Sequence, residues 1–387
     1  MHQLTDITKH FVLQFGAEPS LVIQSPGRIN LIGEHTDYNE GWVFPAAVNK
    51  YLWFACSPRT DAALHITALD INEHAVFPAD DLSKDGRLWL TYLKGILFLF
   101  RQEGYDPGGL NCVFGGNLPI GAGMSSSAAL EVGFAAAVNH LSGAGKSRVE
   151  LAQLAQRSSR EFVGVPCGIM DQFASSMGKK DHFILLDCRD LSFTYIPAIL
   201  DDYQLLLLDT GVTHSNAGSE YGTRVAECRQ GLVFLQQAYP DIVALRDAEV
   251  VQVQALAALM PEKVYKRSLY IAEETRRVGE AKDALLEKSW GHLGDLMFAT
   301  HRGLQHLYEV SCPELDFLVD FAEGFPGVAG ARLMGGGFGG CTLNLVKRGV
   351  VETFIAEAQE AYLHNFGREA AAILVEIGAG TTILHQA

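Results

Sequence analysis

The chain has 387 residues, of which 48% are hydrophobic and 19% are charged. This composition excludes a disordered chain and a collagen-like polymer, and the length predicts two domains. Lysine and arginine number 30 against 45 aspartates and glutamates, so the formal charge of −15 argues against a main activity of binding nucleic acid or anionic membranes. A phosphate-bearing small molecule is compatible with this charge, because a helix N-terminus and one or two cations can bind it locally.

The seven cysteines are scattered and form no Cys-x-x-Cys pair, which is typical of reduced thiols in a cytosolic protein. The N-terminal segment lacks the basic start and apolar run of a secretory signal. The longest apolar runs, such as residues 95–100, are far shorter than the roughly 18 residues that a membrane span needs. We therefore expect a cytoplasmic protein.

The first half of the chain has the pattern of short strands followed by helices. β-Branched and aromatic residues bounded by Pro, Gly, Asp or Asn predict the strands. An Ala-rich stretch that begins with serines predicts a helix at 125–141. In chain order, we expect strands at 21–23, 43–56 and 64–69, helices at 89–101, 125–141 and 147–162, and strands at 182–186 and 203–209.

The second half has a different pattern, because its apolar residues recur at three- and four-residue spacing, which is typical of helices. The change places a domain boundary near residues 195–202, so we expect an N-terminal domain of residues 1–200 and a C-terminal domain of residues 201–387. The predicted elements are helices at 219–237, 244–260, 264–286 and 292–308, a strand, glycine loop and strand at 329–346, a helix at 351–365 and a last strand at 371–377.

A segment rich in glycine and serine at 115–128 leads from a strand into a helix. Its glycines allow a ligand to approach the backbone, its serines supply hydroxyls, and the helix start presents unpaired N–H groups. It is not a Walker loop, because no Lys follows Gly123, and Ser126 stands where a dinucleotide fingerprint needs its third glycine. The segment fits a phosphate, and a glycine turn with serine caps is the alternative.

A polar cluster at residues 28–39 combines a cation, two carboxylates, an imidazole and two amides beside an apolar strand. Such side chains suit the hydroxyls of a sugar, since each hydroxyl both donates and accepts hydrogen bonds. A solvated polar loop is the alternative. Glu34 and His35 do not begin a zinc site, because the second histidine of His-Glu-x-x-His is missing.

Two further features could take part in chemistry. Asp171 lies between apolar neighbours in CGIMDQ, and a partly buried aspartate beside a cation can accept a proton from a hydroxyl. A helix cap or a structural carboxylate is the alternative for Asp171. Residues 335–340 contain five glycines in six positions, which indicates close approach to a ligand or to another backbone, or else a packing or hinge role.

Taken together, these motifs resemble those of the galactokinases, which belong to the GHMP kinase superfamily. The matching segments are GRINLIGEHTDYNEG at 27–41, LPIGAGMSSSAALE at 118–131, CGIMDQ at 167–172 and LMGGGFGGC at 333–341. GEHTDY is specific to galactokinases, whereas the Gly/Ser loop occurs throughout the superfamily. The resemblance implies an α/β (α+β) fold of two domains with the active site in the cleft between them.

In that fold the N-terminal domain contains a left-handed βαβ unit, an exception to the usual right-handed rule, and the C-terminal domain is ferredoxin-like. The last strand can return to the N-terminal domain. Both features are expectations from the resemblance alone.

The resemblance also implies the reaction and the roles of single residues. The chain would transfer a phosphoryl group from ATP to the C1 hydroxyl of α-D-galactose, with Asp171 as the catalytic base and Arg28 holding Asp171 ionised. Phosphoryl transfer requires mainly positioning and charge neutralisation, which the Gly/Ser loop, a magnesium ion and Arg28 can supply. The sugar-binding residues would be Glu34, His35, Thr36, Asp37, Gly168 and Tyr221, and the ATP-binding residues would be Trp89, Gly121, Ala122, Gly123, Met124, Ser125, Ser126 and Ser127.

The chain departs from the family pattern at the expected magnesium site. Relatives usually carry a Glu twelve residues before the catalytic Asp, and Ser159 stands at that position here. Glu161 lies two residues after Ser159, and on a helix this shift points its side chain about 200° away from that of residue 159. Glu161 is therefore only a tentative substitute. Ser127 is therefore the surer ligand of Mg²⁺, and a water held by Ser159 could complete the coordination.

Two other functions stay open. A related sugar kinase, for example one for N-acetylgalactosamine, would share the loops, although Thr36 stands where those relatives commonly have Ile. A non-catalytic sensor would bind galactose and ATP without turnover. We expect galactose and MgATP as ligands, a monomer, and neither a nucleic-acid nor a membrane partner.

Overall fold

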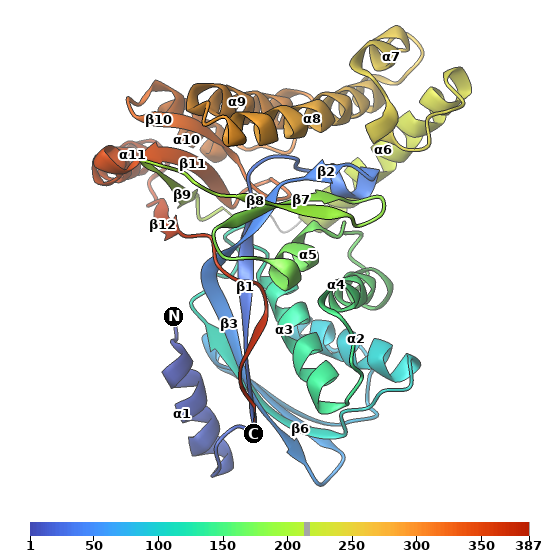
Figure 1. Ribbon diagram of the computed structural model, residues 1–387, viewed down its shortest axis with the longest axis vertical. Helices are drawn as coiled ribbons and strands as arrows, with labels where there is room; N and C mark the ends of the chain where they lie inside the picture. The colour runs from blue at the N-terminus through green and yellow to red at the C-terminus, as the bar shows by residue number, and fades with distance from the viewer. Residues whose placement is uncertain (213–216, 387) are drawn as a thin grey trace.

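The computed structural model describes residues 1–212 and 217–386. It has an elongated shape in which one sheet and its helices form one end and a group of long helices forms the other (Figure 1). Three sheets organise the described residues, with six, four and three strands.

The six-stranded sheet forms the end of the molecule built from the first part of the chain. Its strand order is β13-β1-β3-β6-β4-β5. Helices α2 to α5 cover one face, and α1 packs on the other, against β3 and β6 (Figure 1). The elements are α1 (Leu4–Phe15), β1 (Leu21–Asn30), β3 (Pro45–Arg59), β4 (Ala63–Ala68), β5 (Glu73–Pro78), α2 (Leu88–Gln102), β6 (Gly109–Gly116), α3 (Ser126–Leu141), α4 (Arg148–Arg157), α5 (Met170–Met177) and β13 (Thr382–Gln386).

Strands β4 and β6 pair in parallel, from Leu64 opposite Leu110 to Ala68 opposite Phe114. The connection between them runs through β5 and α2, as a parallel pair requires a crossover. This connection is a βαβ crossover, and the left-handed sense expected from the resemblance stays a prediction.

The four-stranded sheet is antiparallel, with the order β10-β11-β9-β12. The run of leucines in β9 is buried on both faces: Leu205 and Leu207 face one core and Leu206 and Leu208 face another. Helices α8 and α9 contribute to the first core, and α10 and α11 to the second. The elements are β9 (Tyr203–Asp209), α6 (Ala217–Ala238), α7 (Val250–Ala255), α8 (Glu262–Leu286), α9 (Trp290–His306), α10 (Pro313–Gly324), β10 (Val328–Leu333), β11 (Cys341–Lys347), α11 (Val351–Phe366) and β12 (Ala371–Val375).

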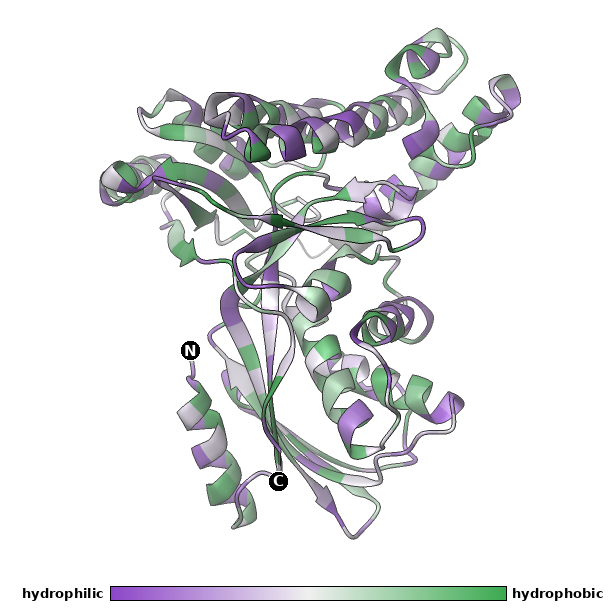
Figure 2. Ribbon diagram, viewed as in Figure 1, coloured by the Kyte–Doolittle hydropathy of each residue, from purple (hydrophilic) through white to green (hydrophobic). Residues whose placement is uncertain are grey.

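A small sheet of β2 (Trp42–Val43), β7 (His182–Asp187) and β8 (Phe193–Pro197) lies between the two ends (Figure 1). Figure 2 shows hydrophilic and hydrophobic residues alternating along α8 and α9, as expected of helices with one buried face. Across residues 1–212 and 217–386, no helix is long and apolar enough to cross a bilayer.

The elements differ from the sequence predictions at several places. The helix predicted at 147–162 is α-helical only to Arg157 and continues as a π-helix over Ser158–Val163. Within the helix predicted at 244–260, only α7 (Val250–Ala255) is α-helical. The strand predicted last stays in the C-terminal sheet as β12, and a further strand, β13, pairs with β1 instead. The division at residue 200 remains our proposal.

Candidate active site

A cavity of about 270 Å³ brings together side chains from distant segments of the chain. Most of them come from β1 and the loop after it, the first turn of α3, the start of α5 with the residues before it, and the glycine loop between β10 and β11, and single side chains come from α2, the π-helix and α6. Of the residues predicted for the site, those that line this cavity are Arg28, Glu34, His35, Asp37, Ser127, Gly168, Asp171 and Tyr221.

Asp171 and Arg28 form an ion pair at this cavity, with Arg28 Nε 2.6 Å from Asp171 Oδ1. The Ser125 hydroxyl donates to Asp171 Oδ2 at 2.5 Å, so both carboxylate oxygens are held. Arg28 is 4% exposed and Asp171 is 34% exposed, which leaves the carboxylate open to a ligand. Burial lowers the pKa of Arg28, but the charges of Asp171 and Glu34 outweigh it and raise that pKa overall. The pair can therefore present an ionised carboxylate to a hydroxyl.

Asp37 and Gly168 are in close contact on one wall of the cavity. A Cβ atom on residue 168 would lie 1.8 Å from Asp37 Oδ2, so only glycine fits there. Burial raises the pKa of Asp37 to about 7, and the charges of Asp171 and Glu34 add to this shift. Asp37 is thus a carboxyl group that titrates near neutral pH at the wall of the cavity.

The Glu34 carboxylate accepts hydrogen bonds from residues in the C-terminal half of the chain. Its Oε1 atom accepts from the backbone N–H of Gly335 at 2.8 Å and from Arg332 Nη2 at 3.0 Å. The Tyr221 ring, on α6, lies against the His35 ring with 5.5 Å between their centroids. Residues from both halves of the chain therefore shape this end of the cavity.

Thr36 is a correction to the predicted sugar-binding set. Its side chain is fully buried, and its hydroxyl bonds the backbone carbonyls of Gly33 at 2.8 Å and Trp42 at 2.7 Å. The hydroxyl thus stabilises the turn that presents Glu34 and His35, and it does not face the cavity.

The Gly/Ser loop is tied to the rest of the site through its backbone. The Arg28 guanidinium donates to the Gly123 carbonyl at 2.5 Å, and the Arg28 backbone N–H donates to the Met124 carbonyl at 3.1 Å. The Cys341 thiol donates to the Ala122 carbonyl at 2.8 Å. Ser125 has a φ of 56°, and α3 begins immediately after it at Ser126. The loop therefore places the start of α3 next to the Asp171 carboxylate.

Trp89 lies away from this cavity, in the first turn of α2. Its indole N–H donates to Glu73 at 2.5 Å, and the Arg87 guanidinium lies 5.7 Å from its ring. Gly121 has a φ of 82°, as expected of a turn that favours glycine. The predicted nucleotide contacts of Trp89 and residues 121–126 stay predictions.

Three family models match the chain. The galactokinase galactose-binding signature matches residues 9–58, the GHMP kinase N-terminal domain matches 91–179, and the GHMP kinase C-terminal domain matches 281–364. A galactokinase of Roseiflexus sp. (strain RS-1) is 39% identical over 94% of this chain and 93% of its own length. The chain belongs to the galactokinase family. A galactokinase of Chloroflexus aurantiacus is 36% identical over the full chain and 99% of its own length.

Solved structures agree with this membership of the galactokinase family. A Lactococcus lactis galactokinase in complex with galactose superposes with a TM-score of 0.93 at 34% identity, over 98% of this chain and 99% of that one. A mevalonate kinase from Methanococcus jannaschii has a TM-score of 0.64 at 18% identity over 93% of this chain and 98% of that one, so it shares the fold. The two-domain GHMP kinase fold predicted from the sequence is confirmed.

Glu161 is a second correction, since it does not take the place of the carboxylate that galactokinases usually have at position 159. Its side chain is 55% exposed and pairs with Arg157 at 3.4 Å, on the surface of the π-helix. Ser159 lies on the opposite side, buried, and lines the cavity. The geometry therefore excludes Glu161 as a ligand within this cavity.

Glu131 is the functional candidate that the sequence reasoning missed. This carboxylate is fully buried, and it accepts from the Ser159 hydroxyl at 2.7 Å and from Gln172 Nε2 at 3.3 Å. It lies four residues after Ser127, so both face the same side of α3. That i, i+4 spacing, with a lone carboxylate in an Ala-rich helix, was the available signal.

Burial raises the pKa of Glu131 to about 8, from an ordinary value of 4.5. Between these two pH values the folded protein holds a proton that the unfolded chain releases, so the free energy of unfolding should fall as pH rises through this window. The slope from this group is at most about 1.4 kcal/mol per pH unit. Glu131→Gln should flatten that slope in urea denaturation measured from pH 5 to pH 8. Equal slopes in both proteins would contradict the prediction.

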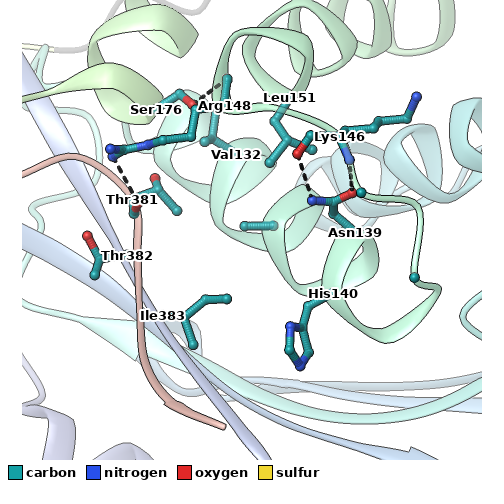
Figure 3. Close-up of a pocket in the computed structure, with 13 residues that line it drawn as sticks. Val132, Asn139, His140, Lys146, Arg148, Leu151, Ser176, Thr381, Thr382 and Ile383 are labelled. Carbon is teal, nitrogen blue, oxygen red and sulfur yellow. Dashed lines mark hydrogen bonds between the residues drawn. The ribbon is translucent and has the colours of Figure 1, made fainter.

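A larger cavity, of about 580 Å³, lies between α3, α4 and β13 (Figure 3). Its polar groups largely bond one another: Arg148 donates to the Thr381 carbonyl at 3.0 Å, and Ser176 donates to the Arg148 carbonyl at 2.6 Å. Asn139 likewise bonds the backbone of Lys146 twice. None of the residues predicted for the site lines this cavity, so size alone does not identify the active site.

Proposed function

We propose that this galactokinase family member transfers the γ-phosphoryl group of ATP to the C1 hydroxyl of α-D-galactose, giving α-D-galactose 1-phosphate and ADP. The observation that carries the proposal is the ion pair between Arg28 and Asp171, 2.6 Å apart. It lies between the residues suited to sugar hydroxyls and the start of α3, which is suited to phosphate. The galactose complex of the Lactococcus lactis galactokinase supports the choice of sugar.

In this mechanism Asp171 accepts the proton of the C1 hydroxyl as that oxygen attacks the γ-phosphorus. Arg28 keeps Asp171 ionised, and it lies close enough to the Gly/Ser loop to stabilise the negative charge that develops on the phosphoryl group. Glu34, His35 and Asp37 orient the sugar, and the N–H groups at the start of α3 hold the phosphates.

The donors at the cavity fit Mg²⁺, which prefers oxygen ligands and keeps several of its waters. Ser127 and Ser159 line the cavity, and Gln172 Oε1 is buried with no hydrogen-bond partner among the described residues. We propose that Ser127 would hold the ion and that Ser159 and Gln172 would supply further polar contacts, with Ser159 bonded in turn to Glu131. The ion would neutralise phosphate charge.

Ser159→Glu should lower the Mg²⁺ concentration that gives half-maximal rate by several-fold. The variant adds a carboxylate at the wall of the cavity, and carboxylate oxygens are preferred ligands of Mg²⁺. The measurement is Mg²⁺ dependence of the rate, together with Mn²⁺ binding by electron paramagnetic resonance in the presence of a non-hydrolysable ATP analogue. Glu161→Gln is the matched control and should change neither. Unchanged metal dependence in Ser159→Glu would refute the idea.

The function itself is tested by ADP release from MgATP with galactose, N-acetylgalactosamine, glucose or no sugar. Turnover with galactose alone is the expected result. Turnover with N-acetylgalactosamine would favour the related sugar kinase, and galactose-dependent thermal stabilisation without turnover would favour a sensor. The family relatives do not favour either alternative. A cytoplasmic location and a monomeric state stay predictions.

A further inference from the structure

A buried carboxylate that does not line the cavity bonds the backbone of the loop after β1. Glu274, on α8, is fully buried. Its Oε1 atom accepts from the Gly33 backbone N–H at 2.7 Å. Its Oε2 atom accepts from Arg277 Nε at 2.7 Å and from the Thr300 hydroxyl at 2.8 Å. One oxygen of this carboxylate therefore bonds the loop, and the other bonds side chains of α8 and α9.

Gly33 occupies a tight turn of this loop. Its φ is 99°, and a Cβ atom on residue 33 would lie 2.8 Å from the Trp42 carbonyl oxygen. The residue is buried, so its N–H needs an acceptor within the protein. The Thr36 hydroxyl donates to the Gly33 carbonyl at 2.8 Å. The two backbone polar groups of Gly33 are thus satisfied by the side chains of Glu274 and Thr36.

The same face of α8 bonds the next residue of the loop. The Tyr270 hydroxyl donates to the Glu34 carbonyl at 3.1 Å, and Tyr270 lies one helical turn before Glu274. His35 follows with a φ of 63°, a left-handed conformation that a residue other than glycine keeps only where its surroundings hold it. Glu34 and His35 both line the cavity. Two side chains of α8 therefore hold the backbone from which these residues reach the cavity.

We propose that Glu274 and Tyr270 are positioning residues, which fix the turn at Gly33 and thereby set the geometry of the sugar end of the cavity. Neither lines the cavity, so both act through the side chains of Glu34 and His35. This inference rests on the proposed function, because it takes the sugar as the ligand at that end. The ion pair proposed for catalysis is held by other elements, so loss of the turn should weaken sugar binding more than it slows phosphoryl transfer.

Glu274→Gln tests the bond to Gly33 without a change in the size of the side chain. An amide has a single acceptor oxygen, so it cannot present an acceptor to both the Gly33 N–H and Arg277 Nε. Hydrogen bonds from a charged donor are the stronger ones, so the oxygen should turn to Arg277 and leave the Gly33 N–H without an acceptor.

The KM for galactose should then rise about three- to tenfold, the loss expected for one hydrogen bond, while kcat and the KM for ATP stay within about twofold. A second readout needs no ligand. Hydrogen exchange of the peptide that contains Gly33, measured by mass spectrometry without sugar or ATP, should become faster in Glu274→Gln. Because this readout needs neither binding nor turnover, its outcome is distinct from a failure of galactose phosphorylation.

The double variant Glu274→Gln, Arg277→Met separates positioning from a purely structural role. Without the guanidinium, the amide oxygen can return to the Gly33 N–H, and the amide nitrogen can donate to the Thr300 hydroxyl. Replacement of a buried ion pair by uncharged groups is often tolerated. The double variant should therefore restore both the KM for galactose and the slow exchange at Gly33. A double variant as impaired as Glu274→Gln alone would overturn the proposal.

Thr300→Val is the matched control, because it removes a donor to the other oxygen of the same carboxylate. It should change neither the KM for galactose nor the exchange at Gly33. Tyr270→Phe loses only a hydroxyl and should raise the KM for galactose in the same direction as Glu274→Gln, which keeps the test available if the glutamine variant does not fold. An unchanged KM in Tyr270→Phe, or an equal rise in Thr300→Val, would overturn the proposal.

Discussion

Replacing Asp171 by Asn should lower kcat about a thousandfold and leave galactose binding nearly intact. Asparagine keeps the size of the side chain but cannot accept a proton, and general-base catalysis typically contributes 10²- to 10⁴-fold. The other sugar contacts stay in place, so the dissociation constant for galactose should change little. ADP release gives kcat, and isothermal titration calorimetry gives the affinity for galactose.

Asp316→Asn is the matched control for this substitution. Asp316 is also a partly buried aspartate with a side-chain partner, 3.3 Å from His301 Nε2, but it lies outside the cavity. Its loss should lower stability without lowering kcat. Turnover of Asp171→Asn at the wild-type rate would remove Asp171 as the base, and loss of galactose binding would indicate a structural role.

Arg332→Met should lower the free energy of unfolding by about 3–5 kcal/mol, the range for breaking a buried ion pair. The guanidinium is fully buried in β10 and bonds Glu34, and it also donates to the backbone carbonyls of Leu31 at 2.8 Å and of Asn30. Without it, the buried Glu34 carboxylate keeps the Gly335 N–H as its one hydrogen-bond donor among the described residues. The loop that carries the proposed sugar-binding residues would also lose its link to the C-terminal sheet.

Urea denaturation of the full chain measures this effect, with galactose-dependent stabilisation as a second readout. Arg302→Met is the control, because Arg302 pairs with Asp320 at 2.7 Å and Glu323 at 2.6 Å while about a third of its side chain is exposed. Such a surface network should contribute about 1 kcal/mol or less. Similar losses in the two variants would show that burial does not set the strength of the Arg332 pair.

The ion pair proposed for catalysis joins two residues that the sequence already singled out, because each motif carries its chemistry in a few adjacent letters. Arg28 and Asp171 are 143 residues apart, yet both were assigned from their own motifs and meet at 2.6 Å. Gly168 and Asp37 likewise come from separate motifs and are in contact. Motif membership did not separate a ligand contact from a turn-forming residue, which is why the prediction for Thr36 was wrong.

Buried charges were the part of the site that local patterns could not reveal. Arg332 lies in an apolar strand and its partner Glu34 is 298 residues away, so no spacing rule connects them. The spacing of Glu131 from Ser127 was a local signal, but its bond to Ser159, which comes from another segment, could not be read from the sequence. Glu161 lies on the surface, in agreement with the turn of about 200° that separates it from position 159 along a helix.

The pairing of β13 with β1 sets an order for the folding of the nascent chain. Leu21 lies opposite Gln386, so the outer edge of β1 can be closed only after nearly the whole chain has left the ribosome. Until then β1 presents unpaired backbone groups, which are a template for association with another chain. A truncated product that ends before residue 382 would keep every residue that lines the candidate active site and still expose this edge. We therefore expect aggregation to lower its yield even though the site is complete.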